Sequence, residues 1–321
     1  MADTIPYTVI GGYLGAGKTT LLNNLLRNSQ GLRLAVLVND FGDVNIDADL
    51  IISHDGETIN LASGCICCSL ADGFMLALNR VSKRRGEIDH IVVEASGVAD
   101  PAKIGHYGAV LKLDLEGVIV LVDAEQIREK AANKYVGETV IRQLKGADLL
   151  VLNKVDLVSP QELESVRGWL AELVPAARIV EAVNGRVPLP LLLGTLHGAA
   201  PADAEVGGQR DSAPHAHGEE HEAMYRTWSF TAETPLVRSD LLSVLEALPE
   251  GLLRAKGFVH LADDPGRRYL LQLVGRRWRL IPGETWGAAA PQTRLVFISL
   301  PGATGLEELR TRLQNHVPEA P

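Results

Sequence analysis

The sequence has few of the features that mark membrane, secreted or nucleic-acid-binding proteins. No stretch of its 321 residues reaches the roughly 18 uninterrupted apolar residues of a membrane span. Basic side chains are outnumbered, with 31 Lys and Arg against 40 Asp and Glu, whereas binding to nucleic-acid phosphates usually requires a basic surface. The first residues show no basic region followed by an apolar run, so we expect no secretory signal. These absences predict a cytoplasmic protein with neither a membrane nor a nucleic acid as its partner.

Cysteine is scarce, and its placement is unusual. The chain has only three cysteines, Cys65, Cys67 and Cys68, within four positions. An odd and tightly clustered set cannot build a framework of disulfides. It indicates metal or redox chemistry in a reducing compartment.

Short apolar runs alternate with longer amphipathic segments from Tyr7 to about Leu196. The predicted strands are Thr8–Gly11, Leu34–Asn39, His90–Glu94, Gly117–Asp123, Leu149–Asn153 and Arg178–Val183. The predicted helices include Thr19–Arg27, Leu70–Arg84, Tyr135–Lys145 and Pro160–Leu173. Nearly all-apolar strands separated by helices indicate an α/β fold, in which helices cover both faces of a parallel sheet.

The character of the sequence changes near His197, and we predict two domains joined by a linker. Residues 1–196 form the first domain. Residues 197–224 are rich in Ala, Gly, Pro, His and acidic side chains, with almost no large apolar residue, so we expect a flexible linker. Residues 225–321 form a smaller α+β domain. Its predicted strands are Thr227–Thr231, Gly257–Leu261, Tyr269–Val274, Arg277–Ile281 and Arg294–Leu300, and its predicted helices are Ser239–Leu248 and Gly305–Asn315.

A phosphate-binding loop lies between the first predicted strand and the first predicted helix. Residues 12–19 match the pattern G-x-x-x-x-G-K-[ST] in the arrangement that this motif requires. Its backbone N–H groups would surround the phosphates, Lys18 would reach the β- and γ-phosphates, and the Thr19 hydroxyl would ligate Mg²⁺. The alternative is a Gly-rich turn with an incidental lysine. We assign nucleotide contacts to Gly12, Leu14, Gly15, Ala16, Gly17, Lys18, Thr19 and Thr20, and predict the parallel sheet of a P-loop NTPase.

Base recognition is predicted at the end of the fifth strand, where Asn153, Lys154 and Asp156 form an N-K-x-D motif. A carboxylate there would accept hydrogen bonds from N1–H and the exocyclic amino group of guanine. Adenine offers no such pair of donors. The motif is weak alone, because Asn and Asp often end strands. After a phosphate loop and an apolar strand it favours GTP over ATP.

The third predicted strand ends in a carboxylate, Glu94, followed by Gly97. In phosphate-loop NTPases this position holds Mg²⁺ or its waters, and a glycine N–H faces the γ-phosphate. The alternative for Glu94 is a solvated strand end. Val98 stands where small GTPases carry a water-orienting Gln, so we expect slow intrinsic hydrolysis. Lys18 and Glu94 are therefore the predicted catalytic residues.

The three cysteines precede the second predicted helix, where a helix N-terminus favours the thiolate that binds metal. Three soft ligands suit Zn²⁺ and can also hold Co²⁺. We expect two or three thiolates and one ligand from elsewhere, an exchangeable site. Buried structural cysteines or a redox switch are the alternatives.

Two further acidic or His-containing segments are candidates for metal contact. Asp40 and Asp43 follow the second strand, the place of the first switch in phosphate-loop GTPases, and could complete the metal shell or touch Mg²⁺. A polar turn is as good an interpretation of either one. In the linker, His215, His217 and His221 have a metal-binding composition. A solubilising linker explains them equally well.

Together, the phosphate loop, Asn39–Gly42, Cys65-x-Cys67-Cys68, Glu94-x-x-Gly97 and Asn153–Asp156 resemble the CobW family of metal-handling GTPases. Residues 252–257 and 271–275 look like parts of that family's C-terminal domain. This chain reads Ala95-Ser96 where the family commonly has Ser-Thr. The resemblance implies a GTPase that delivers Zn²⁺ or Co²⁺ to a client metalloprotein, with GTP and Mg²⁺ as cofactors.

Two other functions compete with this one. A thiol-based redox or metal-sensing regulator would use the nucleotide site only for structure. A kinase-like transferase would need a base for a small-molecule acceptor, and we find no candidate. We expect the C-terminal domain to contact the client or to form a homodimer.

Overall fold

The computed structural model describes residues 4–38, 70–84, 86–194 and 225–315. The chain divides into two compact units, Met1–Leu193 and Gly194–Pro321, and we describe each by itself. Within the described ranges, none of the helices has the length and apolar character needed to cross a membrane.

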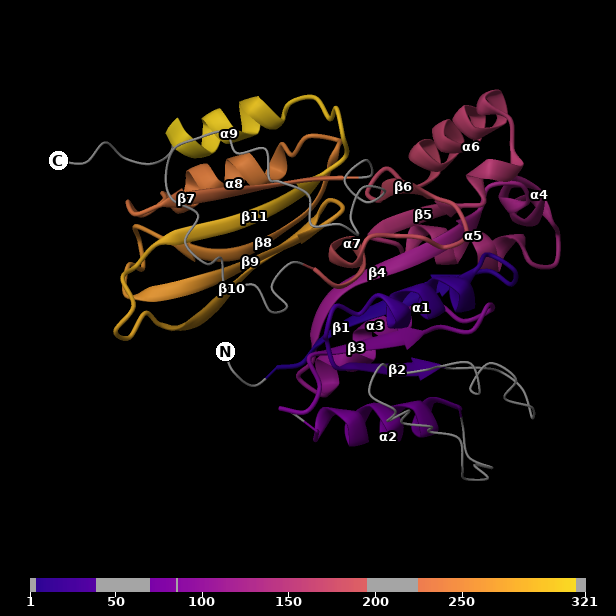
Figure 1. Cartoon of the computed structure of the whole chain (residues 1–321), viewed down its shortest axis with the longest axis horizontal. Helices are drawn as coiled ribbons and strands as arrows, with labels where there is room; N and C mark the ends of the chain where they lie inside the picture. Colours follow the sequence, from indigo (N-terminus) through magenta and orange to yellow (C-terminus); the bar gives the residue numbers. More distant parts are fainter. Residues whose placement is uncertain (1–3, 39–69, 85, 195–224, 316–321) are drawn as a thin grey trace. The chain divides into compact units, whose positions relative to one another are not determined.

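The first unit is built on a six-stranded parallel sheet (Figure 1). The strand order is β2-β3-β1-β4-β5-β6, and every neighbouring pair is parallel. The strands are β1 (Pro6–Gly12), β2 (Leu34–Val38), β3 (His90–Glu94), β4 (Asp114–Asp123), β5 (Leu149–Asn153) and β6 (Arg178–Ala182). The carboxyl ends of parallel strands share one edge, so Gly12, Glu94, Asp123 and Asn153 are brought to the same edge of the sheet.

Helices cover both faces of this sheet. They are α1 (Lys18–Arg27), α2 (Leu70–Ser82), α3 (Pro101–Val110), α4 (Ile127–Ala132), α5 (Gly137–Lys145), α6 (Pro160–Leu173) and α7 (Leu189–Leu193). Successive strand residues point to opposite faces. Tyr7 of β1 joins the core formed with Ile104 and Leu144, whereas its neighbour Thr8 donates a 3.0 Å hydrogen bond to the carbonyl oxygen of Leu192. The predicted fold class is confirmed.

The described residues of the second unit form an antiparallel five-stranded sheet and two helices. Its strand order is β10-β9-β8-β11-β7. The elements are β7 (Arg226–Ala232), α8 (Arg238–Glu246), β8 (Leu252–His260), β9 (Arg267–Val274), β10 (Arg277–Thr285), β11 (Thr293–Ser299) and α9 (Leu306–Asn315). Leu241 and Leu309 of the helices pack with Val259 and Leu271 of the strands, and Trp228 stacks on Phe297 with ring centroids 4.1 Å apart. This is the smaller α+β domain that the sequence predicts.

Among the described helices, three are not among those named from the sequence, namely α3, α4 and α7. The reason is clearest for α3, which begins with Pro101 and contains Gly105 and Gly108, residues of low helix propensity. Glycine is required there by packing, because a Cβ on Gly108 would lie 2.2 Å from Tyr7 Cζ. Helices α4 and α7 have only 6 and 5 residues, too few for a clear apolar repeat.

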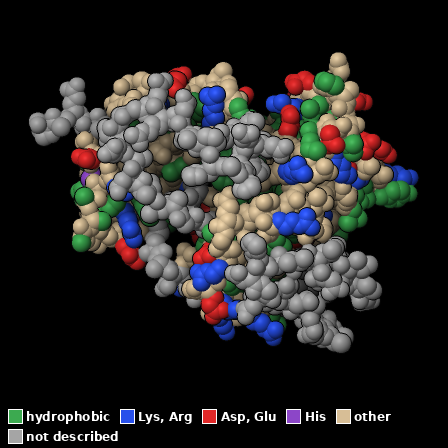
Figure 2. Space-filling view, viewed as in Figure 1, with side chains coloured by type: hydrophobic (Ala, Val, Ile, Leu, Met, Phe, Trp, Pro, Cys, Tyr) green, Lys and Arg blue, Asp and Glu red, His purple; other side chains and the backbone are tan. Residues whose placement is uncertain are grey.

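The described surface carries charge of both signs. Figure 2 shows acidic and basic side chains interspersed over the described residues of the face in view.

Candidate nucleotide-binding site

The phosphate loop connects β1 to α1 through a backbone that only glycine adopts easily. Gly12, Gly15 and Gly17 have φ angles of 135°, 79° and 102°, in the region that L side chains rarely enter. Space is also limited, because a Cβ on Gly12 would lie 2.5 Å from the carbonyl oxygen of Leu121. The glycines of the motif are therefore dictated by both conformation and packing.

Lys18 begins α1 and is held inside the loop. It is 8% exposed, and its Nζ donates a 3.0 Å hydrogen bond to the carbonyl oxygen of Gly12. Gly17 caps the helix without a side chain, and the first turn contains no acidic residue. The loop therefore combines a cation with a helix N-terminus, the two features that attract a phosphate.

Asn153, at the end of β5, joins the phosphate loop to the turn after β6. Its Nδ2 donates a 2.9 Å hydrogen bond to the carbonyl oxygen of Ala16, and its Oδ1 accepts one of 2.9 Å from the N–H of Gly185. The side chain is 2% exposed, so both bonds are shielded from water. The Asn184–Gly185 turn was not predicted from the sequence, although an Asn-Gly pair after a strand is a recognisable turn signal.

The remaining residues of the N-K-x-D motif lie on the surface beside Asn153. Lys154 has a φ angle of 63°, and its Nζ lies 2.7 Å from Asp123 Oδ2. Asp123 is a buried residue that the sequence analysis missed. Its position at the end of a predicted strand could have pointed to it, because Asp123 ends β4 directly opposite Asn153. Asp156 is exposed in a short 3-10 helix, Val155–Leu157. No hydrogen bond or ion pair of its carboxylate occurs among the described residues, so the carboxylate is available to a ligand.

The loop after β3 packs directly against the phosphate loop. Glu94 is the last residue of β3, pairs with Ile10 and is buried. A Cβ on Gly97 would lie 2.4 Å from Leu14 Cδ2 and 3.0 Å from the backbone nitrogen of Leu14, so the two loops approach each other closely at this glycine. Among the described residues, Ser96 Oγ is buried and has no hydrogen-bond partner. The end of β3 and the loop after it thus contain the Glu94 carboxylate, a Ser96 hydroxyl without a hydrogen-bond partner among the described residues, and Gly97, whose backbone carries no side chain.

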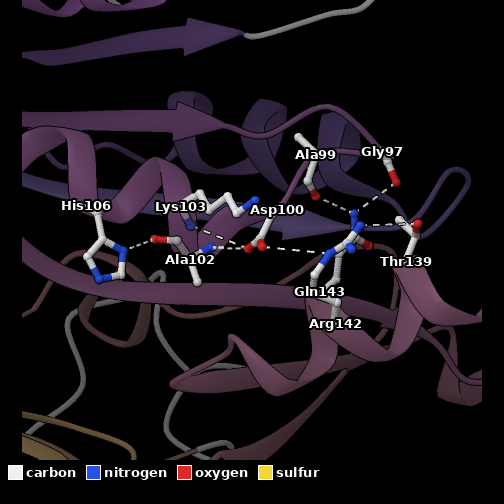
Figure 3. Close-up of polar contacts among 9 residues, drawn as sticks. All are labelled: Gly97, Ala99, Asp100, Ala102, Lys103, His106, Thr139, Arg142 and Gln143. Atoms are coloured by element: carbon white, nitrogen blue, oxygen red, sulfur yellow. Dashed lines mark hydrogen bonds and ion pairs between the residues drawn. The ribbon is translucent and has the colours of Figure 1, made fainter. Parts of the chain in front are cut away.

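Two residues of α5 hold this loop, as Figure 3 shows. Gln143 Nε2 donates to the carbonyl oxygens of Gly97 and Ala99, at 3.0 and 2.7 Å. Arg142 Nε lies 3.8 Å from Asp100 Oδ2, and Asp100 caps α3 by accepting from the N–H of Ala102 at 3.1 Å. Sequence reasoning missed this connection, because Gln143 is remote in the chain and sits in an ordinary amphipathic helix.

The donor set at this edge suits a hard cation. The Thr19 hydroxyl lies in the first turn of α1, and the Glu94 carboxylate and Ser96 hydroxyl come from the adjoining strand end and loop. Mg²⁺ takes oxygen ligands of these kinds. The residues present therefore fit a magnesium ion bound together with phosphates.

Several predicted site residues lie outside the described ranges. They are Asp40, Asp43, Cys65, Cys67 and Cys68, together with His215, His217 and His221. Within the described part of the chain, no group of three or more His, Cys, Asp and Glu side chains could hold a metal ion.

Comparison with known proteins gives two family matches and several relatives. The family profile described as CobW/HypB/UreG, nucleotide-binding domain, matches residues 6–181, and the cobalamin synthesis protein cobW C-terminal domain matches residues 225–316. The zinc chaperone CobW of a Sinorhizobium species is 33% identical, and the match covers 92% of this chain and 93% of that protein.

Two more distant relatives extend the comparison. Zinc chaperone YjiA of Escherichia coli is 30% identical over 93% of this chain and 95% of its own length. Zinc-regulated GTPase metalloprotein activator 1 of Dictyostelium discoideum is 26% identical over 88% of this chain and 69% of its own length. All described residues of the candidate site, from Gly12 to Asp156, fall within the first family match.

Proposed function

We propose, on the premise that this chain belongs to the CobW/HypB/UreG nucleotide-binding family, that it hydrolyses GTP and uses the nucleotide cycle to deliver Zn²⁺ to a client metalloprotein. The observation that carries the proposal is the pair of bonds made by Asn153. The first bond ties the phosphate loop to the end of β5, three residues before Asp156, and the second ties the same strand end to the turn after β6. One ligand with phosphates at one end and guanine at the other would use both parts.

Each nucleotide-site residue has a distinct task in this proposal. Lys18 exchanges its bond to Gly12 for the β- and γ-phosphates, where a charged acceptor makes the stronger hydrogen bond. The exposed carboxylate of Asp156 accepts from guanine, and Lys154, fixed by Asp123, lines the base site. The Gly97 N–H faces the γ-phosphate. Gln143 is a positioning residue that holds the loop in which Gly97 lies.

Magnesium would be held by Thr19 and Glu94. When bound, the ion neutralises charge that develops on the phosphate oxygens. Val98 leaves the loop without an amide to orient the attacking water, so intrinsic turnover is slow.

The metal cargo is assigned to Cys65, Cys67 and Cys68, with Asp40 and Asp43 as neighbouring acids. The relatives support zinc, since their names describe zinc chaperones and a zinc-regulated metalloprotein activator. Co²⁺ remains a second metal that the thiolates could hold. The C-terminal domain, residues 225–321, is proposed to contact the client or a second copy of the chain, and residues 197–224 to link it to the GTPase domain.

The test is a nucleotide and metal assay on the full chain purified without oxygen. We expect phosphate release from GTP but not from ATP, its loss in Lys18→Ala, and bound zinc measured by elemental analysis. Reversible thiol oxidation in a metal-free protein, with GTP bound but never hydrolysed, would instead favour the thiol-based regulator.

A further inference from the structure

A second lysine reaches the phosphate loop from a distant helix. Lys130 lies on α4, and its Nζ donates a 3.0 Å hydrogen bond to the carbonyl oxygen of Leu14, 116 residues earlier. The same Nζ is 5.4 Å from the centroid of the Tyr13 ring. Tyr13 and Leu14 are the two residues that follow Gly12 in the loop, so this cation sits over the loop itself.

The amine is placed there by the fold of the segment after β4. Ile127 anchors α4 in the core at 3% exposure, and the Lys130 N–H bonds to the carbonyl oxygen of Gln126 at 3.0 Å. The amine also lies beside the next position of the loop, Gly15. A Cβ on Gly15 would lie 3.9 Å from Lys130 Nζ, so a side chain at position 15 would contact the cation.

The partner of Lys130 in this structure is a neutral carbonyl oxygen. A phosphate oxygen beside the same loop carries charge, and hydrogen bonds to charged acceptors are about twice as strong as neutral ones. In phosphoryl transfer, negative charge spreads over the oxygens of the transferred group, and a cation brought to them in the transition state can accelerate hydrolysis by orders of magnitude. A flexible four-carbon lysine stem allows Nζ to move from the Leu14 carbonyl to such an oxygen.

We propose that Lys130 is a catalytic residue of GTP hydrolysis, a cation supplied by the chain itself that contacts the γ-phosphate in the transition state. The inference rests on the proposed GTPase function. It gives the site a second cation besides Lys18. The neighbouring loop after β3 has the apolar Val98 where small GTPases carry a polar side chain.

The competing role is structural, since the bond to Leu14 could simply brace the loop. The two roles differ in what they change. Loss of a brace disorders the site that binds GTP, so GTP affinity and turnover fall together. Loss of a transition-state contact lowers kcat and leaves ground-state affinity nearly intact.

The experiment is single-turnover hydrolysis at saturating GTP and Mg²⁺ with the full chain and three variants, Lys130→Ala, Lys130→Arg and Lys134→Ala. Lys134 is the matched control, because it lies four residues further on and its Nζ is 4.7 Å from the Tyr135 ring. We expect Lys130→Ala to lower the rate by about 10²–10³-fold, as loss of a single transition-state donor does. Its Kd for a non-hydrolysable GTP analogue should change less than about threefold, Lys130→Arg should recover most of the rate, and Lys134→Ala should match wild type.

A second measurement uses GDP with aluminium fluoride, which mimics the transferred phosphoryl group. Wild type and Lys130→Arg should bind it, whereas Lys130→Ala should bind GDP alone. Wild-type hydrolysis by Lys130→Ala, or equal losses of GTP affinity and rate, would overturn the role of Lys130 and leave the GTPase function intact. A wild-type chain that binds GTP without hydrolysing it would overturn the GTPase function and, with it, this inference.

Discussion

Asn153 Nδ2 donates a 2.9 Å hydrogen bond to the carbonyl oxygen of Ala16, and this bond joins the end of β5 to the phosphate loop. The other side of the same amide accepts from Gly185 N–H. One buried side chain therefore connects the end of β5 with two loops, the phosphate loop and the turn after β6. Asn153 therefore positions the backbone of the site, whether or not it also contacts a ligand.

Asn153→Ala should destabilise the protein and weaken GTP binding together. The substitution leaves Ala16 O and Gly185 N–H without their partner, and a buried unsatisfied group costs about 1–3 kcal/mol. Chemical denaturation and a GTP titration measure the two effects. Asn28→Ala is the control, because Asn28 bonds only within its own helix end and is exposed. A variant with wild-type stability and affinity would contradict the role of Asn153 as a connector.

Asp156→Asn should change base preference without changing stability. Its carboxylate is exposed and bonds to no described residue, so the fold does not depend on it. An amide cannot accept both guanine hydrogen bonds, and the loss should weaken GTP binding by ~1.5–3 kcal/mol. Xanthosine triphosphate carries a carbonyl in place of the exocyclic amino group, so its affinity for the variant should rise. Competition binding with GTP, ATP and the xanthine nucleotide provides the measurement, and unchanged discrimination would remove Asp156 from base recognition.

Gln143→Leu should slow hydrolysis more than it weakens GTP binding. Leucine keeps the volume but removes both bonds to the loop, at Gly97 O and Ala99 O. At 2% exposure of Gln143, water replaces these bonds poorly, and we expect a loss of about 1–3 kcal/mol in unfolding free energy. Gln161→Leu, on the exposed face of α6, is the matched control. If both variants hydrolyse GTP at the wild-type rate, the hydrogen bonds from Gln143 of α5 do not position the loop after β3 for hydrolysis.

The parts of the site that the sequence predicts are those with local signals. The phosphate loop needs glycine at fixed offsets because its backbone has positive φ angles, and that requirement is visible in eight consecutive residues. The N-K-x-D motif is equally compact. The strands could also be predicted, and β3 and β5 were placed with their observed bounds, because buried parallel strands are almost wholly apolar.

The connecting residues could not be predicted in this way. Gln143 bonds to residues 44 and 46 positions earlier, and Lys130 bonds across 116 positions. Each is an ordinary polar residue in its own helix, and only the packing of α4 and α5 against the sheet brings it to the loops. Helix α3 was missed for a different reason. Gly108 lowers the local helix propensity, but a glycine is needed there because of the close contact with Tyr7.

The last prediction concerns the link between nucleotide and metal. The cysteines immediately precede α2, and Leu78 of α2 packs in the same core as Ile91 and Val93 of β3. Strand β3 ends at Glu94, and the loop that follows touches Leu14 of the phosphate loop through Gly97. A γ-phosphate that orders this loop therefore acts on β3, which shares a core with α2 and pairs with β2. We expect zinc to bind more tightly with GTP than with GDP.

Couplings between two sites are typically about 1–3 kcal/mol, which is about 5–150-fold in affinity. Zinc affinity should be measured by competition with a chelator, in the presence of a GTP analogue and of GDP, for the full chain and for Cys67→Ser. Cobalt measured in the same way tests the second metal. Equal affinities in the two nucleotide states would rule out gating, however tightly the metal binds.

Linkage supplies an independent check, because the two ligands must affect each other equally. If GTP tightens zinc binding by a given factor relative to GDP, zinc must raise the preference for GTP over GDP by the same factor. A nucleotide titration at saturating zinc therefore has no free parameter once the metal affinities and the zinc-free preference for GTP over GDP are known. Failure of this equality would contradict a single zinc site coupled to a single nucleotide site. Coupling that survives substitution of Cys65, Cys67 and Cys68 together would assign the metal to His215, His217 and His221, since these histidines are the alternative metal-binding group in the sequence.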